Sequence, residues 1–366
     1  MKYVVHVMGM PSSKYGGIER FNVALSQALM EKGLKSVFVY ESYPESEAFV
    51  EDLQKNHAEV VVSDSRWHPL RFCKDYIQLL KKYRPIIVHA HFTKARFYAI
   101  PIARFRGIRN LFFTIHSTML PKKEIKPFTR LWYSWTNKMS KVIAVSDDIC
   151  AVYKTNWPNA EVRRIYLGVE QVHGDKNESR GKLGIPQSQM MLLTVSNFNH
   201  IKGLDVLCKA IGLLQDRGEM DGTCLYIVGQ PESDREALGK LIDTLGIQEQ
   251  VRMIGISNDV PCFLTAADIY IQSSRNEGIG LALMEAASAG LPLVGTKVGG
   301  IPEIVRNNYN GLLVPLEDEE ALAKAIGLLM HDEDLRKRYG ECSRKVYRDE
   351  FSVSVGVEQT LDYYGI

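Results

Sequence analysis

Two glutamates and the glycines between them are the first groups that could do chemistry together. Glu277 and Glu285 are eight residues apart, and Gly278 and Gly280 follow the first of them. A carboxylate only accepts hydrogen bonds, so the pair suits the adjacent hydroxyls of a sugar or a ribose. Residues 281–289 are good helix formers, so the turn leads into a helix whose first N–H groups attract an anion such as phosphate. The stretch predicts a site for a sugar joined to a nucleotide through phosphate.

A lysine before another helix indicates the same kind of ligand. A strand-like run at 190–196 leads to Lys202, and apolar side chains at helical spacing begin just after Gly203. A lysine beside a helix N-terminus is electrostatically unfavourable unless an anion lies between them. Lys202 is therefore predicted to contact a phosphate.

A second glycine turn lies near the start of the chain. Gly16 and Gly17 precede a helix predicted from residue 18, so they predict another helix start that attracts an anion. Taken alone, this piece also fits a tight strand-to-helix turn without a ligand. The spacing is not G-x-G-x-x-G, so the dinucleotide fingerprint is absent and a generic NAD enzyme is disfavoured.

Three histidines lie at the ends of predicted strands. His89 and His91 are two apart and point the same way, as two metal ligands would, but no third ligand is evident. We therefore expect ordinary packing and no metal site there. His116 ends another run, where ligands collect outside the carboxyl ends of parallel strands, and is a candidate functional residue.

The elements that position these residues alternate between strand and helix. An apolar run at 268–272 predicts a buried strand before the glutamate turn, and Gly290 with Pro292 ends the helix after it. Further strand-like runs, with helical stretches between them, lie at 3–9, 36–40, 59–63, 86–91, 110–116, 141–146, 190–196, 224–229 and 251–255. This alternation predicts parallel, doubly wound sheets.

Length and charge predict two domains with different partners. The chain has 366 residues, which is long for one core. The polar stretch 170–182 is the best candidate for a linker. Residues 1–170 carry 26 Lys+Arg and 15 Asp+Glu, so the remainder carries 45 − 26 = 19 and 43 − 15 = 28. A basic half precedes an acidic half, which suggests that the two halves contact different molecules.

Residues 273–303, SSRNEGIGLALMEAASAGLPLVGTKVGGIPE, combine a serine, E-G-x-G, a second glutamate, A-x-G-x-P and G-G-x-P-E. The residues are Ser274, Glu277, Gly278, Gly280, Glu285, Ala289, Gly290, Pro292, Gly299, Gly300, Pro302 and Glu303. This string closely resembles the signature of the retaining GT-B glycosyltransferases of family 4. The resemblance is strong over 190–366. In 1–170 it rests only on Gly16, Gly17, His116 and the alternation of predicted strands and helices.

The resemblance implies two Rossmann-like domains that face each other across a cleft. Residues 1–170 would form the acceptor-side domain, with the tail 350–366 packing back on it. Residues 171–349 would form the donor-binding domain.

The resemblance also implies roles for single residues. Glu277 would bind the sugar hydroxyls, Glu285 the ribose hydroxyls and Lys202 the diphosphate. The backbone that contacts the diphosphate would be that of Gly278, Ile279, Gly280 and Leu281.

Two further assignments concern the first domain, and one residue departs from the family pattern. Gly16 and Gly17 would face the donor phosphate, and His116 would touch the sugar and the acceptor. Asn197 stands where the family usually has an arginine, so this chain lacks one charge-assisted phosphate contact that another group must supply.

The resulting prediction is a retaining glycosyltransferase. It would move a hexose-type sugar from a UDP- or GDP-sugar to a glycan or a lipid-linked acceptor, with no metal and no cofactor, in the synthesis of a cell-surface polysaccharide. Two alternatives stay open: a sugar-nucleotide epimerase of the same architecture, and a non-catalytic module that binds nucleotide sugars or glycans.

The cysteines and the basic half bear on the location. Six cysteines without metal spacing indicate reduced side chains, which predicts a cytoplasmic protein. No uninterrupted apolar run reaches the roughly 18 residues that a spanning helix needs, so the chain is not expected to cross a membrane. The stretches 95–109 and 121–141 mix basic and aromatic residues, which predicts a weak peripheral contact with anionic lipid. No nucleic-acid motif accompanies them, so nucleic acid is not an expected partner.

Overall fold

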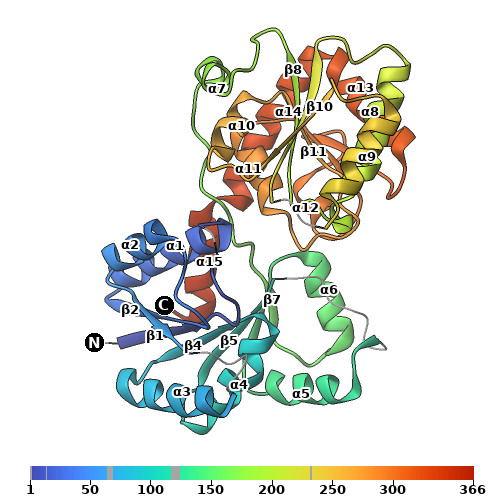
Figure 1. Ribbon diagram of the computed structural model, residues 1–366. Coiled ribbons are helices and arrows are strands. Elements are labelled where there is room, and N and C mark those ends of the chain that lie inside the picture. Colours follow the sequence, from blue (N-terminus) through green and yellow to red (C-terminus); the bar gives the residue numbers. More distant parts are fainter. Residues whose placement is uncertain (1, 14, 64–68, 117–123, 231–232) are drawn as a thin grey trace. The chain divides into compact units, whose positions relative to one another are not determined.

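The computed structural model describes residues 2–13, 15–63, 69–116, 124–230 and 233–366. The chain divides into two compact units, one made of Met1–Val169 with Val353–Ile366 and one of Glu170–Ser352. Both are α/β units with helices on the two faces of a parallel sheet (Figure 1). We refer to them as unit 1 and unit 2.

The sheet of unit 1 has the order β3-β2-β1-β4-β5-β6-β7, and every neighbouring pair is parallel. The strands are β1 Lys2–Val7, β2 Leu34–Tyr40, β3 Glu59–Val62, β4 Ile87–His91, β5 Asn110–Ile115, β6 Lys141–Ala144 and β7 Val162–Arg164. The helices are α1 Gly17–Glu31, α2 Glu47–Lys55, α3 Pro69–Tyr83, α4 Phe92–Phe105, α5 Pro127–Asn137 and α6 Asp147–Asn156. The apolar runs predicted as strands in the first half thus form the strands of this sheet. Their sequences are continuously apolar because the middle strands are buried on both faces.

The C-terminal helix α15, Val353–Tyr364, belongs to unit 1 although its sequence follows unit 2. It packs on α1, and the hydroxyl of Tyr364 lies 2.5 Å from Nδ1 of His89. Gly356 lets the helix approach the backbone, because a Cβ there would lie 2.5 Å from the carbonyl oxygens of Tyr166 and Leu167. The expected return of the tail to the first domain is confirmed.

Unit 2 has a six-stranded sheet of order β10-β9-β8-β11-β12-β13, with all pairs parallel. The strands are β8 Met190–Val195, β9 Thr223–Val228, β10 Val251–Gly255, β11 Ile269–Gln272, β12 Leu293–Thr296 and β13 Gly311–Val314. The helices are α7 Lys176–Leu183, η2 His200–Lys202, α8 Leu204–Asp216, α9 Arg235–Leu245, α10 Val260–Ala266, α11 Leu281–Ala289, α12 Ile301–Ile304, α13 Glu319–His331, α14 Glu333–Val346 and η3 Tyr347–Phe351. Apolar faces of α8 and α13 fill the core against the central strands.

The polar stretch interpreted as a linker is partly a helix of unit 2, which corrects the prediction. Asp175 accepts hydrogen bonds from the N–H groups of Asn177 and Glu178 and so starts α7. Arg180 on this helix is buried, and its guanidinium donates to Asp268 at 2.7 Å and to the carbonyl of Ala266. A charged side chain ties the segment to the domain, so low hydrophobicity alone does not identify a linker.

No helix in the described part of the chain is long and apolar enough to cross a lipid bilayer.

Candidate functional site

The two segments singled out in the second half meet at one edge of the unit 2 sheet. Strands β8 and β11 are parallel neighbours, so the loops that follow Val195 and Gln272 leave the sheet side by side. The first loop carries Lys202 and the second carries Glu277. Their charged groups are in contact, with Nζ of Lys202 2.8 Å from Oε2 of Glu277. The structure thus brings together two residues that the sequence analysis assigned to different parts of one donor.

The lysine and the glutamate are partly shielded from water. Their side chains are 22% and 14% exposed, so the pair is screened less than a surface ion pair. The sequence argument expected an anion beside Lys202, and in this structure that anion is the carboxylate of Glu277. Both groups lie beyond the carboxyl ends of the strands. The ammonium of Lys202 can therefore turn toward a phosphate while the carboxylate of Glu277 accepts hydrogen bonds from sugar hydroxyls.

Two polar residues hold Glu277: Ser274, the serine of the signature string, and Gln272, which the sequence analysis did not single out. The amide of Gln272 lies 3.4 Å from Oε2 of Glu277, and the hydroxyl of Ser274 lies 3.3 Å from the same oxygen. Gln272 also donates to Ser274 at 2.7 Å, and both side chains are buried. Their alternation with apolar strand residues was the available signal, since a polar side chain inside a buried strand needs a partner.

Arg275 fastens the lysine loop to the glutamate loop and was also missed. Its guanidinium makes a bidentate contact of 2.7 and 2.8 Å with Asp205 in the first turn of α8, and it also contacts Glu317. Its backbone N–H and its side chain donate to the carbonyls of Ile201 and His200. The hydrogen bonds from the Arg275 guanidinium to Asp205 hold the pKa of the Asp205 carboxyl below its usual range.

Glycines bring the backbone segments of this edge close together. Gly203 has φ +61°, and a Cβ there would lie 2.1 Å from the carbonyl oxygen of Ser273. A Cβ on Gly299 would lie 1.9 Å from the carbonyl oxygen of Glu277, to which the N–H of Gly300 donates at 3.3 Å. The G-G-x-P-E element therefore supports the loop that carries Glu277.

The helix start predicted at the glutamate loop is present. Gly280, with φ +85°, is the N-cap of α11, and Leu281 is its first residue. Gly278 and Ile279 form the loop just before it, and Ile279 is buried. Leu281, one of the predicted residues, therefore begins the helix, where N–H groups have no carbonyl partner four residues back within the helix.

Glu285 and Asn197 lie at the same edge. Glu285 is half-buried on α11, and its charge, after burial, helps raise the pKa of Tyr270 on β11. The Tyr270 hydroxyl is 3.3 Å from the carbonyl oxygen of Val195, the last residue of β8. Asn197 is half-buried in the loop that follows this strand. The predicted site residues of the second half thus lie on the segments that follow β8 and β11 and on α11.

The glycine turn of unit 1 differs from the expectation. Helix α1 begins at Gly17, one residue earlier than predicted, and Gly16 is its N-cap. The N–H of Gly16 donates to Oε2 of Glu19 at 3.1 Å. Ser12 donates to the other carboxylate oxygen at 3.0 Å. The helix start at Gly16 and Gly17 already has a carboxylate, because an acid at the third helical position reaches back to the cap.

His116 lies at the carboxyl end of β5 and is held by two aromatic side chains. Its Nε2 is 3.2 Å from Nδ1 of His91, and its ring stacks on Phe92 with centroids 4.4 Å apart. Phe92 adopts φ +64°, which is rare for a bulky residue and marks a strained turn between β4 and α4. Burial lowers the pKa of His116 to about 3, so its imidazole is neutral near pH 7.

A third histidine joins the pair on β4, which sequence reasoning missed. His6 on β1 is directly opposite His89 in the sheet register, and ligand atoms of His6, His89 and His91 lie within 4.8 Å of one another. Such a group has the composition of a metal centre. Both ring nitrogens of His89, however, contact hydroxyls, those of Tyr364 and Thr114 at 2.5 and 2.7 Å. Hydrogen bonds within the domain thus occupy one of the three potential ligands, His89. Burial lowers the pKa of all three histidines.

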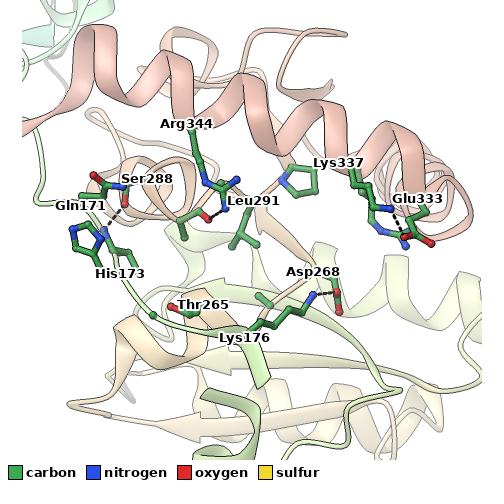
Figure 2. Close-up of a pocket in the computed structure, with 17 residues that line it drawn as sticks. Gln171, His173, Lys176, Thr265, Asp268, Ser288, Leu291, Glu333, Lys337 and Arg344 are labelled. Atoms are coloured by element: carbon green, nitrogen blue, oxygen red, sulfur yellow. Dashed lines mark hydrogen bonds and ion pairs between the residues drawn. The ribbon is translucent and has the colours of Figure 1, made fainter. Parts of the chain in front are cut away.

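A separate cavity of about 480 Å³ lies at the opposite edge of the unit 2 sheet, where β11 and β12 begin. Figure 2 shows the basic residues on its wall, Lys176, Lys337 and Arg344. Lys176 pairs with Asp268, Lys337 pairs with Glu333 at 2.7 Å, and Arg344 donates to the carbonyl of Ala289 at 3.1 Å. None of the predicted site residues lines this cavity, and its labelled cations already have partners within the chain.

Family models match both units. Residues 15–171 match the model of Glycosyltransferase Family 4, and residues 175–346 match the model of Glycosyl transferases group 1. Curated relatives include the N-acetyl-alpha-D-glucosaminyl L-malate synthase of Bacillus anthracis, 28% identical over 57% of this chain and 54% of that protein. Another is the lipopolysaccharide core biosynthesis glycosyltransferase LpsE of Rhizobium meliloti, 32% identical over 47% of this chain and 49% of that protein. The matches thus span about half the length of these relatives.

Solved structures share the fold over the whole chain. Anabaena HepE in complex with UDP has a TM-score of 0.84 at 20% identity and covers 100% of both chains. A glycosyltransferase from Rickettsia africae has a TM-score of 0.85 at 22% identity and covers 99% of this chain and 98% of that one. The predicted fold class, two doubly wound Rossmann-like domains of the GT-B type, is confirmed.

Proposed function

The chain belongs to the family 4 glycosyltransferases of the GT-B fold, and from that premise we propose that it is a retaining hexosyltransferase. It transfers a sugar from a nucleoside-diphosphate sugar to a glycan or a lipid-linked acceptor. The observation that carries this proposal is the contact between Lys202 and Glu277 at the start of α11. One cation, one carboxylate and a row of unpaired N–H groups are the groups that a sugar bound through a diphosphate requires.

The donor we propose is a UDP-sugar rather than a GDP-sugar. HepE, which shares the fold, was crystallised with UDP and with UDP-glucose. In this chain Lys202 and the N–H groups of Gly278 to Leu281 would bind the diphosphate, and Asn197 would contribute its amide where a cation is absent. Glu285 would accept hydrogen bonds from the ribose, and Glu277 from the sugar.

These groups also suggest how transfer proceeds. The bond between the anomeric carbon and the diphosphate oxygen breaks, and negative charge develops on that oxygen. Lys202 and the helix start of α11 would stabilise this charge, which is where a preorganised electrostatic site lowers the barrier most. The acceptor hydroxyl would attack from the face of the leaving group and give its proton to the departing phosphate oxygen. Neutral His116 would orient the sugar or the acceptor through hydrogen bonds.

The proposed reaction needs neither a metal nor a cofactor, because Lys202 and the N–H groups already supply positive charge to the leaving group. It takes place in the cytoplasm, or at the inner face of a membrane when the acceptor is lipid-linked. It contributes to the synthesis of a surface polysaccharide, in keeping with relatives such as LpsE, whose name refers to the lipopolysaccharide core.

A thermal-shift screen against nucleotide sugars tests the proposal. A ligand present at 100 times its Kd adds about 2.7 kcal/mol to the free energy of unfolding, so the preferred base and sugar become visible together. The protein is then incubated with the best nucleotide sugar and candidate acceptors in the presence of a metal chelator. The products are analysed for a transferred sugar and its anomeric configuration.

A transferred sugar with unchanged anomeric configuration is the expected result. An altered sugar nucleotide without any acceptor would indicate an epimerase, and stabilisation by UDP without turnover on any acceptor would indicate a binding module.

A further inference from the structure

Five aromatic side chains form a continuous strip across α4 and α5 of unit 1. Figure 1 shows these two helices on the same face of the unit 1 sheet. Trp132 lies at the centre of the strip, with its ring centroid 4.5 Å from that of Phe97, 6.0 Å from that of Phe128 and 5.0 Å from that of Trp135. Phe105 continues the strip at 6.3 Å from Trp135. We call Phe97, Phe105, Phe128, Trp132 and Trp135, together with Leu131, the α4–α5 face.

The ends of the α4–α5 face are open to solvent. Phe105 is 77% exposed, Phe128 63% and Leu131 71%, which makes them some of the most exposed large apolar side chains of the chain. A helix that only covers the core of its own domain keeps such side chains inward. Large apolar groups gathered on a surface indicate a site of contact with another apolar phase.

Cations surround the α4–α5 face, and acids are nearly absent. Between residues 92 and 141 the chain has a single acidic residue, Glu124. Apart from the buried Arg96, the described cations on α4, on α5 and on the segments that flank them make no ion pair with a described carboxylate at six positions: Arg104, Arg106, Arg109, Lys126, Arg130 and Lys138. Residues 121–123 of the basic stretch lie outside the described residues. The surface therefore combines apolar rings with unpaired positive charge.

We propose that the α4–α5 face docks on the surface of an anionic lipid bilayer. The aromatic rings enter the boundary between headgroups and acyl chains, and the surrounding cations contact lipid phosphates. Complementarity of charge selects this partner: a bilayer offers an apolar layer directly beneath a layer of negative charge, and this face presents the same two features. The proposal rests on unit 1 alone and does not depend on the donor site of unit 2.

Vesicle sedimentation of the purified, untagged full chain tests the proposal. The wild-type protein should sediment with vesicles of phosphatidylglycerol and phosphatidylcholine and stay in solution with vesicles of phosphatidylcholine alone. Binding should weaken as salt is raised, because the contacts with headgroups are screened. Fluorescence should shift to the blue on binding, since Trp132 and Trp135 are both half-exposed on this face.

Two triple variants separate the two contributions. Phe105→Ser/Phe128→Ser/Leu131→Ser removes the exposed apolar groups, and Arg104→Glu/Arg106→Glu/Lys126→Glu reverses charge beside them. Each should lower the partition onto anionic vesicles at least about tenfold, because both terms contribute to interfacial binding. The matched control is Lys209→Glu/Lys324→Glu/Lys345→Glu, which reverses three exposed charges of unit 2 and should bind like the wild type.

Circular dichroism and the midpoint of thermal unfolding report whether each variant is folded. Equal loss of binding in the control and in the charge variant would contradict the proposal, because bulk charge would then explain it. Binding to phosphatidylcholine alone, or a dimer without vesicles that the serine variant dissociates, would overturn it in favour of a purely apolar contact or a second copy of the chain.

Discussion

Lys202 and Glu277 neutralise each other in a place where neither is fully hydrated. Glu277 is held by Gln272 and Ser274, while the loop of Lys202 is held by Arg275. The position of the carboxylate is therefore fixed by the strand end, and the ammonium is the more mobile partner because it ends a flexible four-carbon side chain. This arrangement suits a lysine that exchanges a carboxylate for a phosphate when the donor binds.

Loss of either charge should therefore remove transition-state stabilisation. Lys202→Ala and Glu277→Ala should each lower kcat at least about 100-fold, the scale of losing one preorganised electrostatic contact. Initial rates at saturating donor measure the effect. Lys209→Ala changes an exposed lysine on α8 and should leave kcat unchanged. Near-normal turnover in both site variants would reject the assignment.

His116 should act as a neutral hydrogen-bonding group. Its pKa is lowered to about 3 by burial, so the protonated fraction is negligible above about pH 5. His116→Ala should lower activity, and His116→Asn should retain part of it because an amide also donates and accepts.

The ratio of wild-type to His116→Asn activity should be constant from about pH 5 to about pH 8, where a free histidine would titrate. Complete pH profiles of both proteins measure this ratio. A ratio that changes around pH 6.5 would show that the imidazole works as a titrating acid or base.

At the level of elements, glycines hold the site together through close backbone contacts. Gly203 and Gly218 have similar left-handed conformations, with φ of +61° and +71°. Only Gly203 has a close neighbour, the carbonyl oxygen of Ser273, whereas nothing lies within 4 Å of a Cβ on Gly218. The two positions therefore differ in crowding and not in backbone conformation.

Alanine substitutions at the two glycines should separate the cost of the left-handed backbone conformation from the cost of a steric clash of the new Cβ. Gly218→Ala should cost about 1 kcal/mol of unfolding free energy, the usual penalty of a left-handed alanine. Gly203→Ala should cost at least about 2 kcal/mol and lower the affinity for UDP, because the start of α8 must move away from Ser273. Urea unfolding and calorimetric titration measure both effects. Equal costs would show that the loops accommodate a methyl group without moving.

Local patterns predicted most of the elements, and long-range contacts account for what they missed. The strand runs, the helix after Gly280 and the stop at Gly290 depend on periodicity and turn residues within a few positions. The bond between Arg275 and Asp205 joins residues 70 positions apart, and no local pattern contains it. His6 met the histidines of β4 only because β1 and β4 pair in register, which depends on the strand order of the whole sheet.

At the scale of the whole molecule, the two units differ in how they should respond to acid. Unit 1 contains the buried histidines His6, His89 and His91 and the half-buried His116, and desolvation lowers the pKa of each below its usual range. In the unfolded chain a histidine titrates near 6.5. Between about pH 6.5 and pH 3 the unfolded chain therefore binds more protons than the folded chain, and stability falls as pH falls.

Unit 1 should consequently unfold before unit 2 when the pH is lowered from 7 toward 4. Each of these histidines lowers the free energy of unfolding by at most about 1.4 kcal/mol for every pH unit of acidification. Four of them together can therefore cancel the stability of a typical domain within a few pH units. All four tryptophans, at positions 67, 132, 135 and 157, lie in the sequence of unit 1, so their fluorescence reports that unit alone. Circular dichroism reports the helices of both units. We expect the fluorescence transition at a higher pH than the main change in helix content.

A single substitution tests whether the histidines cause this difference. Neither ring nitrogen of His6 has a hydrogen-bond partner among the described residues, so His6→Leu removes a titrating group without removing a hydrogen bond. This variant should shift the fluorescence transition to lower pH. His173→Gln, at an exposed histidine of unit 2, should leave it unchanged. Coincident transitions in the wild type, or an unaltered midpoint in His6→Leu, would mean that other groups, such as the carboxylates of the acidic unit 2, govern unfolding in acid.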